Sequence, residues 1–303
     1  MRESRAVVIF NAALVIICLT LVALSSSRVA AQAASPDPAV ILAAAREAIG
    51  GEKQIAALKT LIITGRTRQV RGDNLVPIEF EISCEFPDKY IRRDEIPAQE
   101  NGPTTAGFAG DTLIQVPPLP TGPGRAGAPA PSAAQLEAAR TLRATALKQD
   151  FARLMLGLFA QTYSGYPLTF TYFGTAEAPQ GQADVLDVKG AGTFAAKFFI
   201  YKTTHLPVML SWQPGPAGAG RGIPGRGVLP PGAAPASPPP TGGAPQATAP
   251  PETRLYFADY RDVDGLKLPF RIRRAIGADT VEETTFDRFR FNAKIDSRKF
   301  EVK

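Results

Sequence analysis

The stretch that decides the fold is T-R-L-Y-F-A-D-Y-R-D-V-D-G-L-K-L-P-F-R-I, residues 253–272. Apolar and polar residues alternate in it, the alternation breaks at Asp264-Gly265, and then it resumes. Because successive side chains of a strand point to opposite faces of a sheet, this pattern predicts two strands joined by a tight turn. Gly265 can take the left-handed conformation that such turns need. The stretch therefore predicts a β-hairpin, with strands at 253–262 and 266–276.

The same alternation recurs through most of the chain. The clearest example is 76–86, where every even-numbered residue is apolar while Glu79, Glu81, Ser83 and Glu85 alternate with them. Such a strand has one face in the core and one face in water. Further strands are expected at 61–70, 89–96, 111–116, 168–173, 183–189, 194–203, 208–213 and 280–292. The pattern predicts ten or eleven antiparallel strands in all.

Two substantial helices are expected among these strands. Asp37 can cap a helix whose first turn holds Pro38, and Gly50-Gly51 ends it. A short helical piece is expected at 52–58. Ser132 and Gln135 form a capping box that begins a long helix at 133–161. Strand group, long helix and strand group in this order indicate an α+β fold, a strongly curved antiparallel sheet covered by helices.

The N-terminus is typical of an exported protein. Arg2 and Arg5 precede an apolar run at 6–24, and Ala31-Gln32-Ala33 fits a cleavage site. We expect residues 1–33 to be a signal peptide that directs the chain to the periplasm and is removed. The alternative is an uncleaved N-terminal anchor, since the apolar run approaches the length of a membrane span.

Residues 34–303 are expected to form a single domain with two Pro/Gly-rich disordered insertions, at 117–131 and 214–251. In the second insertion, Pro and Gly occupy 21 of 38 positions, too many for a segment that must bury apolar surface. The whole chain carries a net charge of +6, and residues 1–33 account for +2 of it. This modest charge, together with export, argues against nucleic acid as a partner, and we expect a monomer.

The sequence offers little catalytic or metal-binding chemistry. It contains one histidine, His205, and the mature chain would keep one cysteine, Cys84, which lies on the apolar face of its strand. Asp262 and Asp264 resemble the start of a calcium loop, but the later ligands are missing and a hairpin turn explains them. No nucleophile elbow, phosphate-binding loop or His/Cys cluster is present. We expect no enzyme activity, cofactor or metal, although hydrolysis by carboxylates alone stays open.

Several local motifs resemble those of the LolA/LolB superfamily of periplasmic lipoprotein carriers. They occur in the order of that family: GGEKQIAALKTLIITG (50–65), CEFPDKYIR (84–92), FAGDTLI (108–114) and YRDVDGLKLP (260–269). The resemblance implies an incomplete barrel closed by helices, with an apolar cavity that takes acyl chains. One position departs from the family, because the carrier has an arginine directly before the turn proline and this chain has Phe86 before Pro87. That departure puts energised lipoprotein shuttling in doubt.

In such a fold, the inward faces of the strands would line the cavity and the long helix would be its lid. The candidate cavity-lining residues are Phe80, Ile82, Phe170, Tyr172, Phe198, Ile200, Leu210, Trp212, Phe270 and Ile272. The candidate lid residues, at helical spacing on 133–161, are Phe151, Leu154, Met155 and Leu158. The alternative is that the same side chains are ordinary core beneath the helices.

The sequence thus predicts a non-catalytic periplasmic binding or carrier protein for a hydrophobic ligand, either a lipid or a lipoprotein acyl chain. The alternative is an envelope sensor or interaction module that recognises a protein partner through the Pro-rich segment 214–251. Deletion of that segment would separate the two hypotheses.

Overall fold

The computed structural model describes residues 35–97, 99–100, 102–122, 129–213 and 251–301. The predicted signal peptide at 1–33, residues 123–128 of the first predicted insertion and residues 214–250 of the second lie outside the described residues. All of the described helices and strands belong to the unit that begins at Pro36.

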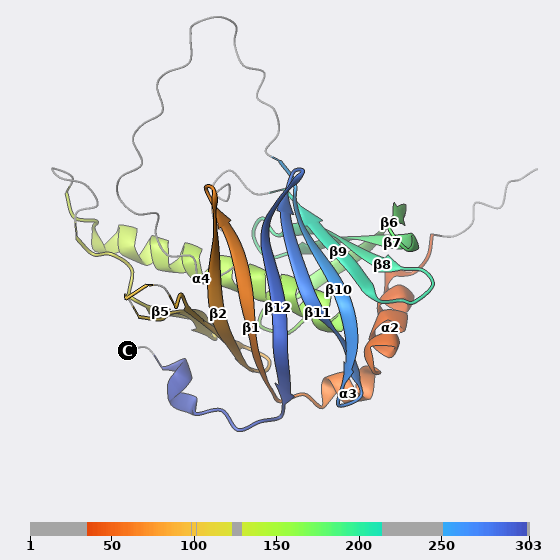
Figure 1. Ribbon diagram of the computed structural model, residues 1–303, viewed down its shortest axis with the longest axis horizontal. Helices are drawn as coiled ribbons and strands as arrows, with labels where there is room; N and C mark the ends of the chain where they lie inside the picture. Colours follow the sequence, from red (N-terminus) through yellow and green to blue (C-terminus); the bar gives the residue numbers. More distant parts are fainter. Residues whose placement is uncertain (1–34, 98, 101, 123–128, 214–250, 302–303) are drawn as a thin grey trace, which may run out of the picture. The chain divides into compact units, whose positions relative to one another are not determined.

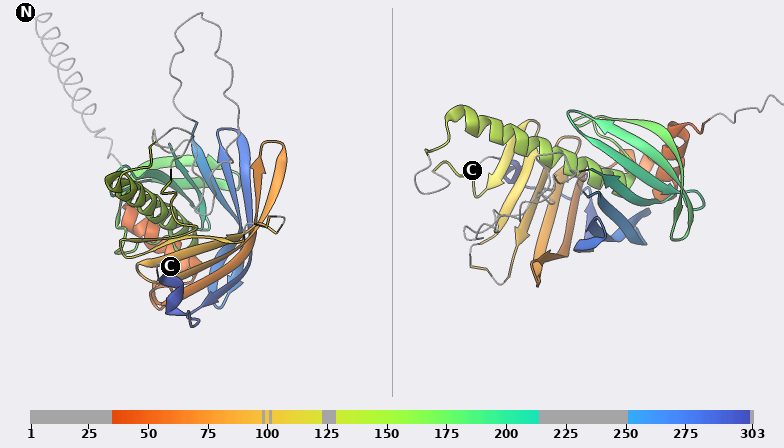
Figure 2. Two further views of the ribbon diagram at one scale, coloured as in Figure 1. Left: turned by 90° about the vertical axis from the view of Figure 1, so that its left-hand side faces the viewer. Right: turned by 90° about the horizontal axis from the view of Figure 1, so that it is seen from above.

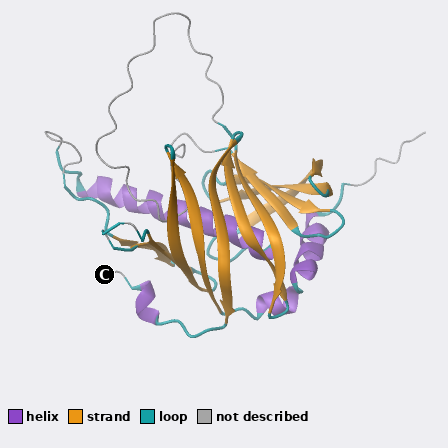
Figure 3. Cartoon of the chain, in the orientation of Figure 1, coloured by secondary structure: helices purple, strands orange, loops and turns teal. Residues whose placement is uncertain are grey.

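The described strands form one antiparallel sheet of 12 strands, in the order β5-β4-β3-β2-β1-β12-β11-β10-β9-β8-β7-β6 (Figures 1 and 3). The first group is β1 (Thr60–Arg71), β2 (Asn74–Glu85), β3 (Lys89–Glu95), β4 (Thr104–Ala109) and β5 (Thr112–Val116). The second group is β6 (Leu168–Ala178), β7 (Gly181–Gly190), β8 (Ala195–Tyr201), β9 (Pro207–Trp212), β10 (Thr253–Val263), β11 (Leu266–Ile276) and β12 (Asp279–Phe291). The sheet is open, with β5 and β6 at its edges.

The two strand groups meet where the first strand pairs with the last. β1 and β12 are antiparallel neighbours from Leu61↔Phe291 to Gln69↔Glu282. This pairing joins two meanders into one curved surface, and Figure 2 shows the sheet bending around the long helix. The α+β prediction of a strongly curved antiparallel sheet covered by helices is confirmed.

The hairpin predicted from residues 253–272 is present as β10 and β11. Val263 pairs with Leu266, and both turn residues have positive φ, 50° at Asp264 and 84° at Gly265. The turn packs against the corner between the first two helices, because a Cβ on Gly50 would collide with the Gly265 carbonyl and with Leu266. The interruption in the alternation is therefore both a turn and a packing contact.

Three α-helices lie in the described part of the chain, and the predicted caps begin two of them. α2 (Pro38–Ile49) starts where the Asp37 side chain accepts a hydrogen bond from the Ala39 backbone N–H, and α3 (Glu52–Ala56) follows. α4 (Ala133–Phe159) starts at the capping box of Ser132 and Gln135. It crosses the concave face and contacts β4 and β5 of the first group and β9 of the second.

One strand was missed by the sequence analysis. β4 (Thr104–Ala109) reads T-T-A-G-F-A, which is short, lacks clear alternation and contains a glycine. Gly107 is needed because a Cβ there would collide with the Tyr90 carbonyl and with Ile91 of β3. The close approach of β3 and β4 requires a glycine at this position, and that glycine interrupts the apolar alternation by which strands are recognised.

The C-terminal tail is also ordered. Residues Ser297–Phe300 form a 3₁₀ helix, η1, whose Phe300 packs with Ile91 and Ile114 in a small second core. In the described part of the chain, no helix combines the length and the apolar character that crossing a membrane requires.

Candidate ligand-binding site

The candidate lid residues lie on the face of α4 that packs on the sheet. Phe151, Met155 and Leu158 are buried, and Leu154 is partly buried at the edge of the same cluster. The N-terminal third of α4 has no buried residue before Ala144, so only the later turns cover the sheet. A single amphipathic segment therefore covers the centre of the concave face.

The candidate cavity-lining residues all join that same apolar cluster. Phe170, Tyr172 and Trp212 are partly buried against it. The other seven are buried within it: Phe80, Ile82, Phe198, Ile200, Leu210, Phe270 and Ile272. The structure therefore brings the predicted set together, but most of its members are packed as core with α4 in place.

A cavity of about 40 Å³ remains between α4 and the sheet. It borders four of the predicted residues, Ile82, Leu154, Trp212 and Ile272. Eight further residues that the sequence analysis did not select also line it: Tyr90, Arg92, Asp150, Arg153, Leu255, Arg274, Thr284 and Phe286. The cavity has room for a few water molecules. Pockets that hold drug-sized ligands are typically several times larger, roughly 300–1,000 Å³.

Two of the three arginines in the wall of this cavity lie at Trp212. Arg153 of α4 is 8% exposed and Arg274 of β11 is 6% exposed. Arg153 Nη1 donates to Asp150 Oδ1 at 3.0 Å, and its guanidinium lies 4.3 Å from the centre of the Trp212 ring. The Arg274 guanidinium lies 5.6 Å from the same ring. Trp212 thus contacts both cations through its aromatic face.

Burial also changes the acid–base properties of this wall. Burial lowers the pKa of Arg153, and the nearby Asp150 carboxylate only partly offsets this effect. Burial likewise raises the pKa of Asp150, although the charges of Arg153 and Arg274 act in the opposite direction. The two arginines therefore share a poorly solvated cavity wall with Asp150, whose carboxylate both of them influence.

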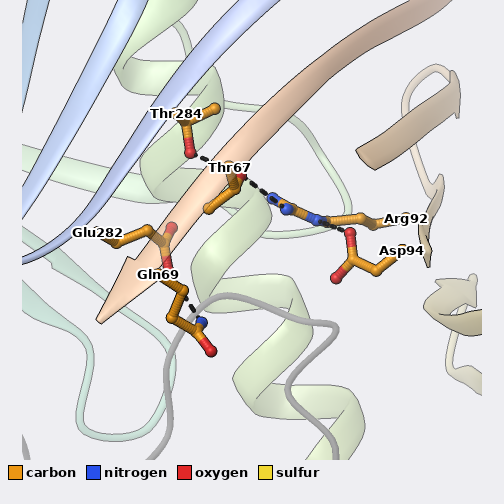
Figure 4. A network of polar contacts seen from close by, with 6 residues as sticks. All are labelled: Thr67, Gln69, Arg92, Asp94, Glu282 and Thr284. Carbon is orange, nitrogen blue, oxygen red and sulfur yellow. Dashed lines mark hydrogen bonds and ion pairs between the residues drawn. The ribbon is translucent and has the colours of Figure 1, made fainter. Parts of the chain in front are cut away.

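A buried polar network continues from the cavity along the middle strands (Figure 4). Arg92 Nε donates to Asp94 Oδ1 at 2.6 Å, and Arg92 Nη2 donates to Thr67 Oγ1 at 3.3 Å. The hydroxyls of Thr67 and Thr284 lie 2.9 Å apart. Beyond them, Gln69 Nε2 donates to Glu282 Oε2 at 3.5 Å. The network links β3, β1 and β12 on the face that α4 covers.

The sequence did contain a signal for Arg92 and Arg274. Arg274 has the same strand parity as Phe270 and Ile272, so its side chain had to point inward with theirs. Arg92 shares its parity with Tyr90 in the same way. Selection of inward positions by apolar character alone left both arginines out.

The position that departs from the LolA family lies at the end of α4. Phe86 stacks on Tyr163, which follows the helix, with ring centroids 4.7 Å apart and planes inclined by 8°. In this chain an aromatic pair connects the turn after β2 to the segment after α4.

The remaining candidate residues have ordinary structural roles. His205 is an exposed turn residue with φ 57°. Cys84 is fully buried, and burial raises the pKa of its thiol far above the usual range. Glu81 and Glu85 form ion pairs with Lys299 and Lys89. Within the described residues, no group of three or more His, Cys, Asp or Glu side chains could hold a metal ion.

Comparisons with known proteins bear on the fold. No family model matches the chain, and no curated protein does. Among solved structures, a LolA superfamily protein from Nitrosomonas europaea is similar at 11% sequence identity, with a TM-score of 0.50 over 87% of this chain and 96% of that one.

Two other solved structures are less similar. An outer membrane lipoprotein-sorting protein domain assigned in Vibrio parahaemolyticus has 8% identity and a TM-score of 0.46 over 86% of this chain and 95% of that one. A DUF1329 family protein from Desulfovibrio piger has 10% identity and a TM-score of 0.43 over 88% and 98%. At such identities the likeness concerns the fold, and the first structure carries it. With its open 12-stranded antiparallel sheet and covering helices, the chain has a LolA-like fold.

Proposed function

We propose that this chain is an exported, non-catalytic binding or carrier protein for a hydrophobic ligand, the acyl chain of a lipid or lipoprotein. The observation that supports this proposal is the way in which a helix covers the concave face of the sheet. One helix, α4, lies over a continuous set of apolar side chains that come from both strand groups. The N-terminal segment outside the described residues supports export by its sequence alone.

Binding of an acyl chain requires α4 to move. The cavity of about 40 Å³ is far below the volume of an ordinary ligand pocket. Displacement of the turns that carry Phe151, Met155 and Leu158 would uncover the apolar surface beneath them. A ligand tail would then take the place of the helix on this surface. Its burial would contribute about 25 cal/mol of binding free energy per Å² of apolar area kept from water.

Uptake of a fluorescent fatty probe by the purified mature protein tests this proposal. Leu154→Gln alters a residue at the cavity wall, whereas Leu142→Gln makes the same change on an exposed residue of the same helix, 64% accessible. We expect Leu154→Gln to strengthen uptake by about tenfold, because the loss of one leucine contact with the sheet makes α4 easier to displace, and Leu142→Gln to leave uptake unchanged. Wild-type protein that takes up no probe, or two variants that behave alike, would contradict the proposal.

Native mass spectrometry of protein purified from its own envelope would name the ligand. A co-purifying acyl species supports the carrier function. Protein that stays empty after incubation with envelope lipids would favour the alternative, recognition of a protein partner through 214–251, which capture experiments with and without that segment would then test.

A further inference from the structure

Two buried cations in the cavity wall have hydrogen-bond donors without acceptors. Nε of Arg153 and both Nε and Nη1 of Arg274 find no partner among the described residues. Each residue is more than nine-tenths buried, and each lines the cavity. Buried guanidinium donors that lack acceptors cost free energy of folding. A protein that retains such donors is therefore expected to bind a molecule that supplies the acceptors.

The nearby carboxylates are engaged elsewhere. Asp150 accepts from Arg153 Nη1 at 3.0 Å, and Asp94 accepts from Arg92 Nε at 2.6 Å. Glu282 pairs with Arg274 in the strand register, yet its carboxylate accepts from Gln69 Nε2 and does not reach Nε or Nη1 of Arg274. The unused donors therefore belong to two cavity-lining residues and have no acceptor in the described part of the protein.

Most of the remaining cavity wall is apolar or aromatic, and its other polar residues are Arg92, Asp150 and Thr284. Leu154 of α4, Leu255 of β10 and Phe286 of β12 line the same cavity as the two arginines, and Trp212 lies against both guanidinium groups. The planar fork of an arginine matches the two oxygens of a carboxylate or phosphate. A cavity of about 40 Å³ is suited to a small head group rather than to a chain.

We propose that Arg153 and Arg274 bind the oxyanion head group of the hydrophobic ligand, so that this protein selects acidic amphiphiles over neutral ones. The inference rests on the proposed function and specifies its ligand class. The head group occupies the space between α4 and β11 and accepts hydrogen bonds from the unused N–H groups. The tail extends over the apolar surface that α4 covers in its absence.

Competition against a neutral fluorescent probe tests the selectivity with four ligands that share one alkyl chain. They are hexadecanoate, hexadecyl phosphate, hexadecanol and hexadecyltrimethylammonium, each used below its aggregation concentration. We expect the two oxyanions to compete at least tenfold better than the alcohol, as hydrogen bonds to charged groups allow, and the cation to compete worst. The ratio of carboxylate to phosphate then tells which head group fits better.

Arg274→Gln is the decisive variant, because it removes the two unpaired donors, Nε and Nη1, of a cavity-lining cation. Arg273→Gln is its matched control, since Arg273 is the exposed neighbour on the same strand and lies over the Tyr256 ring. We expect Arg274→Gln to abolish the preference for oxyanions while hexadecanol binds as before, and Arg273→Gln to retain the preference. Urea unfolding of the empty protein should show Arg274→Gln at least as stable as wild type, because unpaired buried donors are removed.

The outcomes separate the two levels of the proposal. Equal binding of alcohol and oxyanions by wild type, or a preference that survives in Arg274→Gln, would overturn the head-group assignment and leave the carrier function standing. Failure of every ligand to displace the probe would overturn both. Displacement by inorganic phosphate alone, as effective as by hexadecyl phosphate, would assign the site to a free anion and overturn the assignment to an amphiphile.

Discussion

Phe86 and Tyr163 stack face to face, with ring centroids 4.7 Å apart and an angle of 8° between the planes. Phe86 directly follows the last residue of β2, and Tyr163 lies four residues beyond the last residue of α4. The pair therefore fixes the C-terminal end of α4 to the first strand group. It lies at the position where the resemblance to LolA implies an arginine instead.

A double-mutant cycle should show that these two rings act together. Phe86→Leu and Tyr163→Leu each keep apolar volume and remove the stacking. We expect a coupling energy of about 0.5–1.5 kcal/mol in the free energy of unfolding, measured by urea denaturation of the four proteins. Strictly additive effects would mean that the rings only fill space.

The contact between Gly157 and Phe257 controls how closely α4 approaches the sheet. A Cβ on Gly157 would overlap two atoms of the Phe257 ring of β10. Alanine normally stabilises a helix relative to glycine by up to about 1 kcal/mol, but here the steric clash opposes that gain. We expect Gly157→Ala to lower the free energy of unfolding by about 1–3 kcal/mol and to speed uptake of a fatty probe.

Gly122→Ala is the matched control for that experiment, because a Cβ on Gly122 meets nothing within 4 Å. Addition of Phe257→Leu to Gly157→Ala should restore part of the lost stability by making room for the new methyl group. A Gly157→Ala protein more stable than wild type would show that α4 does not rest on this contact.

The buried ion pair of Arg92 and Asp94 should make the stability of the fold depend on pH. Burial raises the pKa of Asp94 above that of an unfolded aspartate, although Arg92 acts to lower it. The folded state thus holds this proton more tightly, so the associated stability is complete below the unfolded pKa of about 3.9 and is lost as pH rises through the folded pKa. We expect the stability of wild type relative to Asp94→Asn to fall as the pH rises above the unfolded pKa of about 3.9.

Asp111→Asn should show the opposite sign. A hydrogen bond from Lys148, with Nζ 2.6 Å from Oδ1, lowers the pKa of the exposed Asp111 carboxyl. The contribution of Asp111 to the free energy of unfolding is therefore present above the unfolded-state pKa. It is lost as the pH falls through the folded-state pKa. Urea unfolding at several pH values for the three proteins tests both signs. Parallel curves for wild type and Asp94→Asn would contradict the raised pKa.

Trp212 and Thr253 are paired across β9 and β10, although 214–251 separates them in the chain. Replacement of these 38 residues by four Gly/Ser residues should therefore retain the sheet. If the segment is flexible, as its composition predicts, the shorter loop should raise the free energy of unfolding by about 2 kcal/mol, roughly three halvings of loop length. Circular dichroism and urea unfolding measure this. Loss of the fold would show that the segment contributes essential contacts.

Much of the architecture could be predicted because strand periodicity and helix caps are local signals. The alternation in β2 placed Ile78, Phe80 and Ile82 on the buried face, as observed. Asp37 and Ser132 marked helix starts to the residue. β4 could not be predicted, because its Gly107 is required by the close approach of β3. The sequence of β4 alone gives no sign of that contact between strands.

The site was harder to predict than the fold for a different reason. Parity tells which side chains face inward, and Phe198, Leu210 and Ile272 do so. It does not tell which of them α4 covers fully and which border a cavity. That distinction depends on the path of α4, which its own sequence does not fix. The charged wall of Arg153 and Arg274 was missed because inward charge was not considered.

The pairing of β1 with β12 has a consequence for how the protein is made. Leu61 and Phe291, neighbours in the sheet, are 230 residues apart in the sequence. The pairing of β1 with β12 cannot form until almost the whole polypeptide is available, and contacts of such long range form slowly. A chain with this topology therefore completes its core only after nearly all of it has been synthesised.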